Sequence, residues 1–198
     1  MNAALMAPRF AVDGRLVRVV PTGRGNVNDT YLAIFRTTFS EERFILQRLN
    51  RKVFTSPDNV MHNMQVVTEH VHRRLDREAH LTDRIWQLPR IIPAKDQEDY
   101  IIDTNENCWR AISLIASAHS HEQIQRLEHA HEAGFVLGQF QRLISDIPPD
   151  KLEDTLPGFH ISPQYLDKMD ASVGTEDGQS RLQSLAAAEQ CYQFISER

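Results

Sequence analysis

The chain has 198 residues, of which 41% are hydrophobic and 25% charged, and its formal net charge is -5. A chain of this length buries a real core, as one large domain or two small ones. The acidic balance gives no reason to expect a nucleic acid or an anionic membrane as the main partner. Residues 1–10 lack the apolar run of a signal peptide and no later stretch is long enough to span a bilayer, so we expect a soluble, cytoplasmic protein.

The cysteines and histidines give no sign of a metal or disulfide site. Cys108 and Cys191 form no CxxC pair, and such isolated thiols are typical of a reducing compartment. His129 and His131 are two residues apart on a predicted helix, where they point to different faces and do not chelate one ion easily. We expect two free thiols and solvated histidines.

The first half of the chain is rich in predicted strands. Short β-branched or apolar segments bounded by turn residues indicate strands at residues 16–20, 31–35, 43–49, 88–93 and 100–103. Ser56 and Pro57 indicate a helix start, because serine caps free amides and proline suits the first helical position. Apolar residues then recur at helical spacing: Val60, Met64, Val67, Val71 and Leu75. Residues 105–107 are a predicted turn into residues 109–115. Five strands with one helix inserted after the third predict a compact α+β lobe.

The second half is predicted to be helical. Ser120 and Gln123 match a capping box, and apolar residues line one helix face from there to Ile144. Ser162 and Pro163 mark the start of a short predicted helix, and a last predicted helix covers residues 181–195. The change from strands to helices places a domain boundary near residues 115–120.

A glycine-containing turn lies between the first two predicted strands. Gly23 and Gly25 have no side chain in the way of backbone N–H groups that approach phosphate oxygens. Asn28 and Thr30 add polar groups beside the turn. Ordinary hairpins also carry two glycines, so a phosphate site and a plain hairpin both remain open.

The third predicted strand should supply a cation or a strong donor to such a site, as the lysine of kinases does. Residues 43–49 contain no lysine, and Gln47 and Arg48 are the candidates. Because side chains alternate along a strand, only one of them faces the site. Arg48 would bring a charge and Gln47 a hydrogen bond, and an outward Arg48 is equally compatible. Glu69 on the following helix is the candidate that orients this group, although a solvated helix face explains it equally well.

Several blocks of the sequence resemble one family, in the family's order. They are residues 25–31 (GNVNDTY), 44–50 (FILQRLN), 54–61 (FTSPDNVM) with Asn63, 67–70 (VTEH), and 157–160 (PGFH) with Pro163. These blocks resemble the N-acetylhexosamine 1-kinases of the aminoglycoside phosphotransferase and choline kinase superfamily. The resemblance runs over about residues 19–168.

The resemblance implies a two-lobed, protein-kinase-like fold and ATP-dependent phosphoryl transfer to the anomeric hydroxyl of an N-acetylhexosamine. It implies a nucleotide-binding N-lobe over residues 1–116 and a partial helical substrate lobe over residues 117–198. ATP and magnesium (Mg) are the implied cofactors, and a nucleotide and an amino sugar the implied ligands. The implied nucleotide-binding residues are Gly25, Asn26, Asn28, Asp29, Thr30, Gln47, Arg48 and Glu69. Residues 112–117 correspond to the hinge that would meet the adenine ring.

The sequence departs from this family in its later part. These kinases need a His-x-Asp-type loop whose aspartate accepts the substrate proton, and a further aspartate that holds magnesium. Neither follows the last predicted helix, and Asp146, Asp150 and Asp167 have no such context. We therefore expect a truncated member with negligible turnover alone, and assign no catalytic or metal residue. Bare apolar helix faces would then cause self-association or bind a complementing chain.

Other interpretations remain open. A non-catalytic protein would keep the glycine turn as a module that binds a nucleotide or a partner. One half of a split kinase would receive its catalytic loop from a second chain. A plain α+β domain without any nucleotide is the third alternative.

Overall fold

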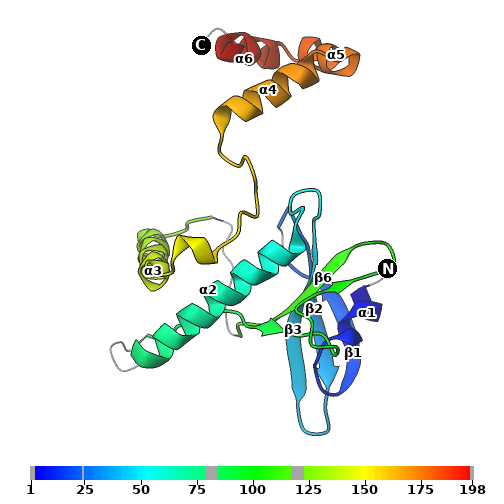
Figure 1. Ribbon diagram of the computed structural model, residues 1–198, viewed down its shortest axis with the longest axis vertical. Helices are drawn as coiled ribbons and strands as arrows, with labels where there is room; N and C mark the ends of the chain where they lie inside the picture. The colour runs from blue at the N-terminus through cyan, green and yellow to red at the C-terminus, as the bar shows by residue number, and fades with distance from the viewer. Residues whose placement is uncertain (1–2, 24, 79–83, 117–122, 197–198) are drawn as a thin grey trace. The chain divides into compact units, whose positions relative to one another are not determined.

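The structure is a computed structural model that describes residues 3–23, 25–78, 84–116 and 123–196 (Figure 1). Its contacts divide the chain into two units, Met1–Thr155 and Leu156–Arg198. The predicted cap at Ser120 and most of the predicted boundary near residues 115–120 lie outside the described residues. Within the described ranges, no helix is long and apolar enough to cross a membrane.

The first unit is built on an antiparallel sheet of six strands, which confirms the predicted α+β class (Figure 1). The strands are β1 (Arg15–Pro21), β2 (Asp29–Arg36), β3 (Glu41–Leu49), β4 (Ile91–Ile92), β5 (Ile101–Ile102) and β6 (Cys108–Ser113). Their order is β1-β2-β3-β6-β4, and β5 also pairs with β6. The meander of β1, β2 and β3 corresponds to the first three predicted strands.

The prediction of five strands was wrong, because the segment after the turn at residues 105–107 is itself a strand. This strand, β6, pairs with β3 along one edge and with β4 and β5 along the other, so it is a central strand of the sheet. β4 and β5 are shorter than predicted. Pro89 and Pro93 have no N–H to donate to a neighbouring strand, and the chain turns at Asp103.

The helices of the first unit precede, interrupt and follow the strands of the sheet. They are α1 (Ala3–Met6), the 3-10 turn η1 (Ala7–Arg9), α2 (Pro57–Glu78), α3 (Leu127–Ile144) and the 3-10 turn η3 (Pro149–Lys151). As predicted, α2 begins at Pro57 and follows the third strand. Of the residues in α3, Leu143 alone is buried, while Leu127 and Leu137 of its predicted apolar face are exposed.

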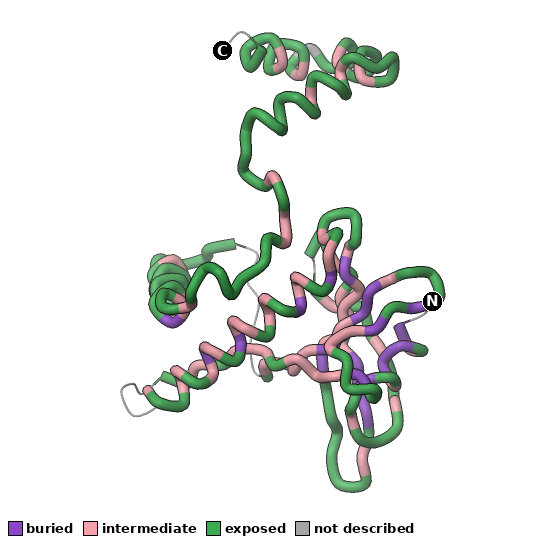
Figure 2. Tube along the Cα trace, viewed as in Figure 1, coloured by how far each residue is buried: buried purple, intermediate pink, exposed green. Residues whose placement is uncertain are grey.

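The two faces of the sheet carry different side chains. One face packs against α1 and η1 and contains the aromatic part of the core, in which Phe35, Phe44 and Trp109 are almost fully buried. Figure 2 marks the buried, intermediate and exposed residues along the chain. Alternation puts Gln47 and Arg110 on the opposite face. That face lies against α2, since Nη1 of Arg110 is 3.4 Å from Sδ of Met64.

The second unit consists of α4 (Ser162–Val173), α5 (Glu176–Ser184) and α6 (Ala186–Ser196). The prediction of one helix over residues 181–195 was wrong, because Leu185 has an extended backbone (φ -131°, ψ 96°) that separates α5 from α6. A cap starts α5, where Oγ1 of Thr175 accepts a hydrogen bond from the backbone N–H of Gly178 at 3.1 Å. None of the residues of this unit whose burial is described is buried.

Candidate functional site

The turn that joins β1 to β2 is open to solvent. Its base is closed by a hydrogen bond of 2.9 Å from the backbone N–H of Thr22 to the carbonyl oxygen of Thr30. Gly23 has a φ of 75°, a conformation that glycine adopts without strain. A Cβ added at Gly23 or at Gly25 would meet no atom within 4 Å, so nothing described covers the backbone there.

Asn28 fixes the end of the turn against the end of the third strand. Its Oδ1 accepts a hydrogen bond of 3.0 Å from the backbone N–H of Asn50. Asn26 and Gly25, nearer the middle of the turn, are exposed. Among its described residues, the turn is thus anchored at both ends and exposed at Gly23, Gly25 and Asn26.

Gln47 and Arg48 lie on opposite faces of β3. Nε of Arg48 donates to Oδ2 of Asp29 at 2.7 Å, and its guanidinium lies 6.0 Å from the centroid of the Trp109 ring. Two residues expected near the phosphates, Arg48 and Asp29, therefore pair with each other on the face that carries Trp109. The positive charge of Arg48 is balanced by this carboxylate.

Gln47 belongs to a row of three polar side chains on the other face, which we call the polar row: Thr30, Gln47 and Arg110. They lie side by side because the register pairs Thr30 with Gln47 and Gln47 with Arg110. Nε of Arg110 donates to Oε1 of Gln47 at 3.0 Å, and Nε2 of Gln47 donates to Oγ1 of Thr30 at 3.1 Å. The row runs from β6 across β3 to Thr30, the second residue of β2 after the glycine turn.

Arg110 is the residue of this site that the sequence did not indicate. Its Nη1 contacts the sulfur atoms of Met64 at 3.4 Å and Met61 at 4.0 Å, under α2. Burial lowers the pKa of its guanidinium, although arginine still remains charged. No carboxylate within the described ranges forms an ion pair with Arg110, so its neighbours are the neutral side chains of Gln47 and the two methionines. A partly buried charge of this kind is usually paired.

Glu69 lies apart from the polar row. It is exposed on α2, and its Oε1 accepts a hydrogen bond of 3.2 Å from Nε2 of Gln65. It lines a hollow of about 230 Å³ that also includes Thr68, Arg90 and Asp99. None of the contacts found among the described residues joins Glu69 to Gln47 or Arg48, so the structure does not bring these candidates together.

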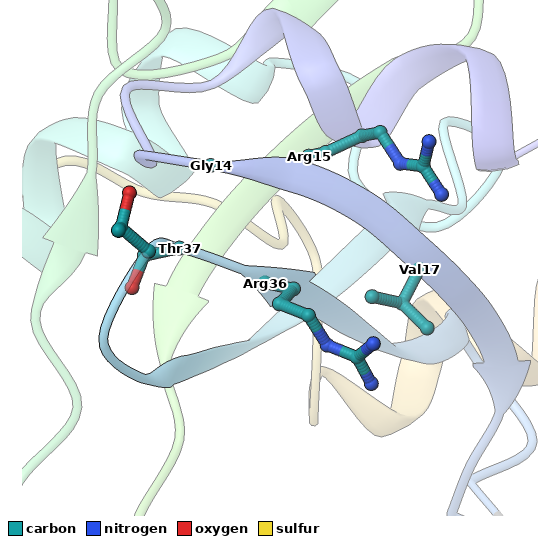
Figure 3. A pocket seen from close by; sticks show the side chains of 6 residues that line it. Gly14, Arg15, Val17, Arg36 and Thr37 are labelled. Carbon is teal, nitrogen blue, oxygen red and sulfur yellow. The ribbon is translucent and has the colours of Figure 1, made fainter.

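A second hollow, of about 430 Å³, lies at the other end of β1 and β2 from the glycine turn (Figure 3). Arg15 and Arg36 are register partners there, and their side chains extend from neighbouring strands on either side of Val17 (Figure 3). Gly14 is required at this point, because a Cβ on it would lie 2.4 Å from the carbonyl oxygen of Arg36. The hollow is separate from the polar row.

The described residues fit a phosphate better than a magnesium ion. Donors gather beside the turn, whereas Asp29, the acid at the start of β2, is paired with Arg48. In the part of the chain that the structure describes, no group of three or more His, Cys, Asp or Glu side chains could hold a metal ion.

A scan of the chain against models of known protein families finds no match. The site is thus defined by its geometry: an open glycine turn with a row of donors at its base.

Proposed function

We propose that the first unit binds the phosphates of ATP at the glycine turn, as the nucleotide-binding lobe of a sugar kinase-like protein of the N-acetylhexosamine 1-kinase type. The observation that carries the proposal is the open turn between β1 and β2 with the polar row beside it. Backbone N–H groups of a glycine turn approach phosphate oxygens without a side chain between them.

The order of the elements supports this proposal. A glycine turn joins the first two strands, a third strand follows, and α2 is inserted before the chain returns to the sheet. This is the order that the resemblance implies for the nucleotide lobe of a kinase. The sheet also presents the side chain of Gln47, rather than that of Arg48, toward α2.

The charge at the site supports an anionic ligand. Arg110 has only neutral partners among the described residues, whereas Arg48 is balanced by Asp29. A phosphate near the polar row would partly compensate the charge of Arg110. In this proposal Arg110 takes the place of the lysine that kinases carry on the third strand.

Transfer of the phosphoryl group is a separate step. By resemblance, the acceptor is the anomeric hydroxyl of an N-acetylhexosamine, and transfer needs an aspartate that takes its proton. The sequence contains no His-x-Asp motif to supply it. Asp146 in the helical half is already paired with His70 and Arg74. We therefore propose nucleotide binding with negligible turnover by this chain alone.

Titration of the chain with ATP, followed by its thermal stability, tests the proposal. A ligand that binds the folded state raises the melting temperature in a saturable way. Gly25→Val should weaken the effect, because the added side chain fills space above the turn without touching the fold. Gly138→Ala on the exposed face of α3 is the matched control. Absence of any shift at millimolar ATP, from a chain that melts cooperatively, would overturn the proposal.

A further inference from the structure

The hydrogen bonds of the polar row have a fixed direction. A guanidinium has donors and no acceptor, so Gln47 must turn its Oε1 toward Arg110. Its Nε2 then points to Thr30 and donates to Oγ1 of that residue at 3.1 Å. Because Oγ1 of Thr30 accepts this bond, the hydroxyl hydrogen of Thr30 is left to be donated to a further acceptor.

Nothing described takes that hydrogen. Among the hydrogen bonds of the described residues, none is donated by the hydroxyl of Thr30. The row is therefore a chain of donors that begins at a cation and ends at a hydroxyl group. Each bond in such a chain polarises the next, which makes the terminal hydroxyl a better donor.

The free end of the row lies at the base of the glycine turn. Thr30 is the residue whose carbonyl oxygen closes the turn with the backbone N–H of Thr22. Thr30 is only partly buried, so part of the residue is open to a ligand at the turn. A hydroxyl donates its strongest hydrogen bonds to an ionised oxygen.

We propose that the hydroxyl of Thr30 donates to a phosphate oxygen of the bound nucleotide, and that Gln47 and Arg110 are positioning residues that make Thr30 a donor. For the identity of its ligand the inference rests on the nucleotide binding proposed above. Arg110 acts through Gln47 and through its charge, and Arg48 has no part in the row.

A purely structural role of the row predicts different behaviour, and Gln47→Glu separates the two. The carboxylate of this variant would accept from both Arg110 and Thr30 and would pair with the partly buried cation. The fold should gain stability, because the charge of Arg110 acquires a partner. Anion binding should be lost, because the hydroxyl of Thr30 then donates to the carboxylate and a negative charge lies at the site. A structural role predicts a change in stability alone.

The experiment measures, on the full chain, the affinity for ATP and for inorganic tripolyphosphate by calorimetry and the melting temperature of each variant. Thr30→Val keeps the shape of the side chain but removes the donor to the charged ligand, together with the acceptor of the Gln47 bond, and should weaken binding of both ligands about tenfold or more. Thr30→Ser keeps the hydroxyl and should restore binding. Gln47→Glu should weaken binding about a hundredfold while its melting temperature rises. Arg110→Met should also weaken binding of both ligands. Its control is Arg43→Met, a substitution on β3 outside the polar row.

Wild-type affinity for both ligands in Thr30→Val and Gln47→Glu would overturn the inference. Because valine has the shape of threonine, Thr30→Val should fold. Its affinity therefore tests the inference even if Arg110→Met does not fold. Binding of tripolyphosphate but not ATP, with the same dependence on Thr30, would support the phosphate site and overturn the proposed nucleotide function. Binding of neither ligand by the wild-type chain would overturn both.

Discussion

Asn63 on α2 and Glu153 bind each other reciprocally. Nδ2 of Asn63 donates to the carbonyl oxygen of Glu153 at 2.8 Å, and the backbone N–H of Glu153 donates to Oδ1 of Asn63 at 2.8 Å. His62, one residue earlier, binds the carbonyl oxygen of Lys151 through Nε2 at 3.0 Å. Side chains of α2 thus hold the backbone of residues 151–153 through hydrogen bonds.

Replacement of Asn63 by alanine should loosen the attachment of this segment to α2. It removes two partly exposed hydrogen bonds, and we expect a loss of about 1–2 kcal/mol in the free energy of unfolding. Hydrogen exchange is the sharper measurement, because the amide of Glu153 loses its acceptor and should exchange faster. Gln65→Ala is the control, since the side chain of Gln65 donates to Glu69 within the same helix. Unchanged protection of Glu153 would contradict the role of Asn63.

Asp103 organises the turn that leads into β6. Its buried carboxylate accepts hydrogen bonds from Nε1 of Trp109 at 2.9 Å and from the backbone N–H groups of Asn105 at 2.8 Å and Asn107 at 3.0 Å. Burial raises the pKa of this carboxyl, but the hydrogen bonds from Trp109 and Asn107 outweigh it and hold the pKa below its ordinary value. The ionised form is therefore the one that stabilises the fold.

This pKa shift predicts an acid-dependent loss of stability. Because the pKa is lower in the folded state, the contribution of Asp103 is complete above the unfolded value of roughly 4 and falls as the pH drops toward the folded value. Asp103→Asn should cost about 1–3 kcal/mol at neutral pH, because an amide N–H then faces other donors. The variant should also lose less stability below pH 4, measured by urea unfolding followed by tryptophan fluorescence. An equal acid dependence in Asp103→Asn and in the exposed control Asp13→Asn would contradict this.

The two cysteines should differ in reactivity. Cys108 on β6 is fully buried, and burial raises the pKa of its thiol to about 12. Cys191 on α6 is exposed. Since the thiolate is the reactive form, a disulfide reagent at pH 8 should label Cys191 alone in the native chain and both thiols in urea. Rapid labelling of Cys108 in the native Cys191→Ala variant would show that its thiol is accessible to the reagent, which would contradict its burial in β6.

Arg74 joins α2 to the end of α3. Its Nη1 donates to the carbonyl oxygens of Arg142 at 2.9 Å and Leu143 at 3.4 Å, and to Oδ1 of Asp146 at 2.8 Å. These carbonyls belong to the last turn of α3, where a cation is favourable.

Arg74→Met should therefore loosen α3 at a cost of about 1–2 kcal/mol, since bonds and a helix-end charge are lost together. Faster hydrogen exchange of the α3 amides, with little change in those of β3, is the expected result. Arg73→Met is the matched control, because Arg73 is the exposed neighbour on the same helix. Equal exchange in both variants would contradict the role of Arg74.

Local sequence patterns predicted the elements that depend on local rules. The β-branched segments gave the first three strands, and proline at the first helical position gave the start of α2. Thr175, Glu176 and Asp177 also form a helix-start pattern, and the start of α5 could have been predicted from it. The break at Leu185 has no such local signal, because the residues around it are good helix formers.

Arg110 was not predictable from the sequence around the turn. Alternation indicates only that Gln47 and Arg48 point to opposite faces, and the pairing of β3 with β6 selects which residue lies beside Gln47. A shift of one residue in that register would place Trp109 or Ala111 there instead. Register depends on the packing of the whole sheet, including the burial of Trp109 in the core cluster that also contains residues of α1 and η1, and not on the residues near Gln47.

The central strand β6 is also the last strand of the sheet to be synthesised. β1, β2 and β3 precede α2 and β6 in the chain, so they leave the ribosome first during synthesis. Until β6 emerges, the edge of β3 is unpaired and exposed to other chains. The residues of the glycine turn are therefore made before Arg110, the cation of the polar row.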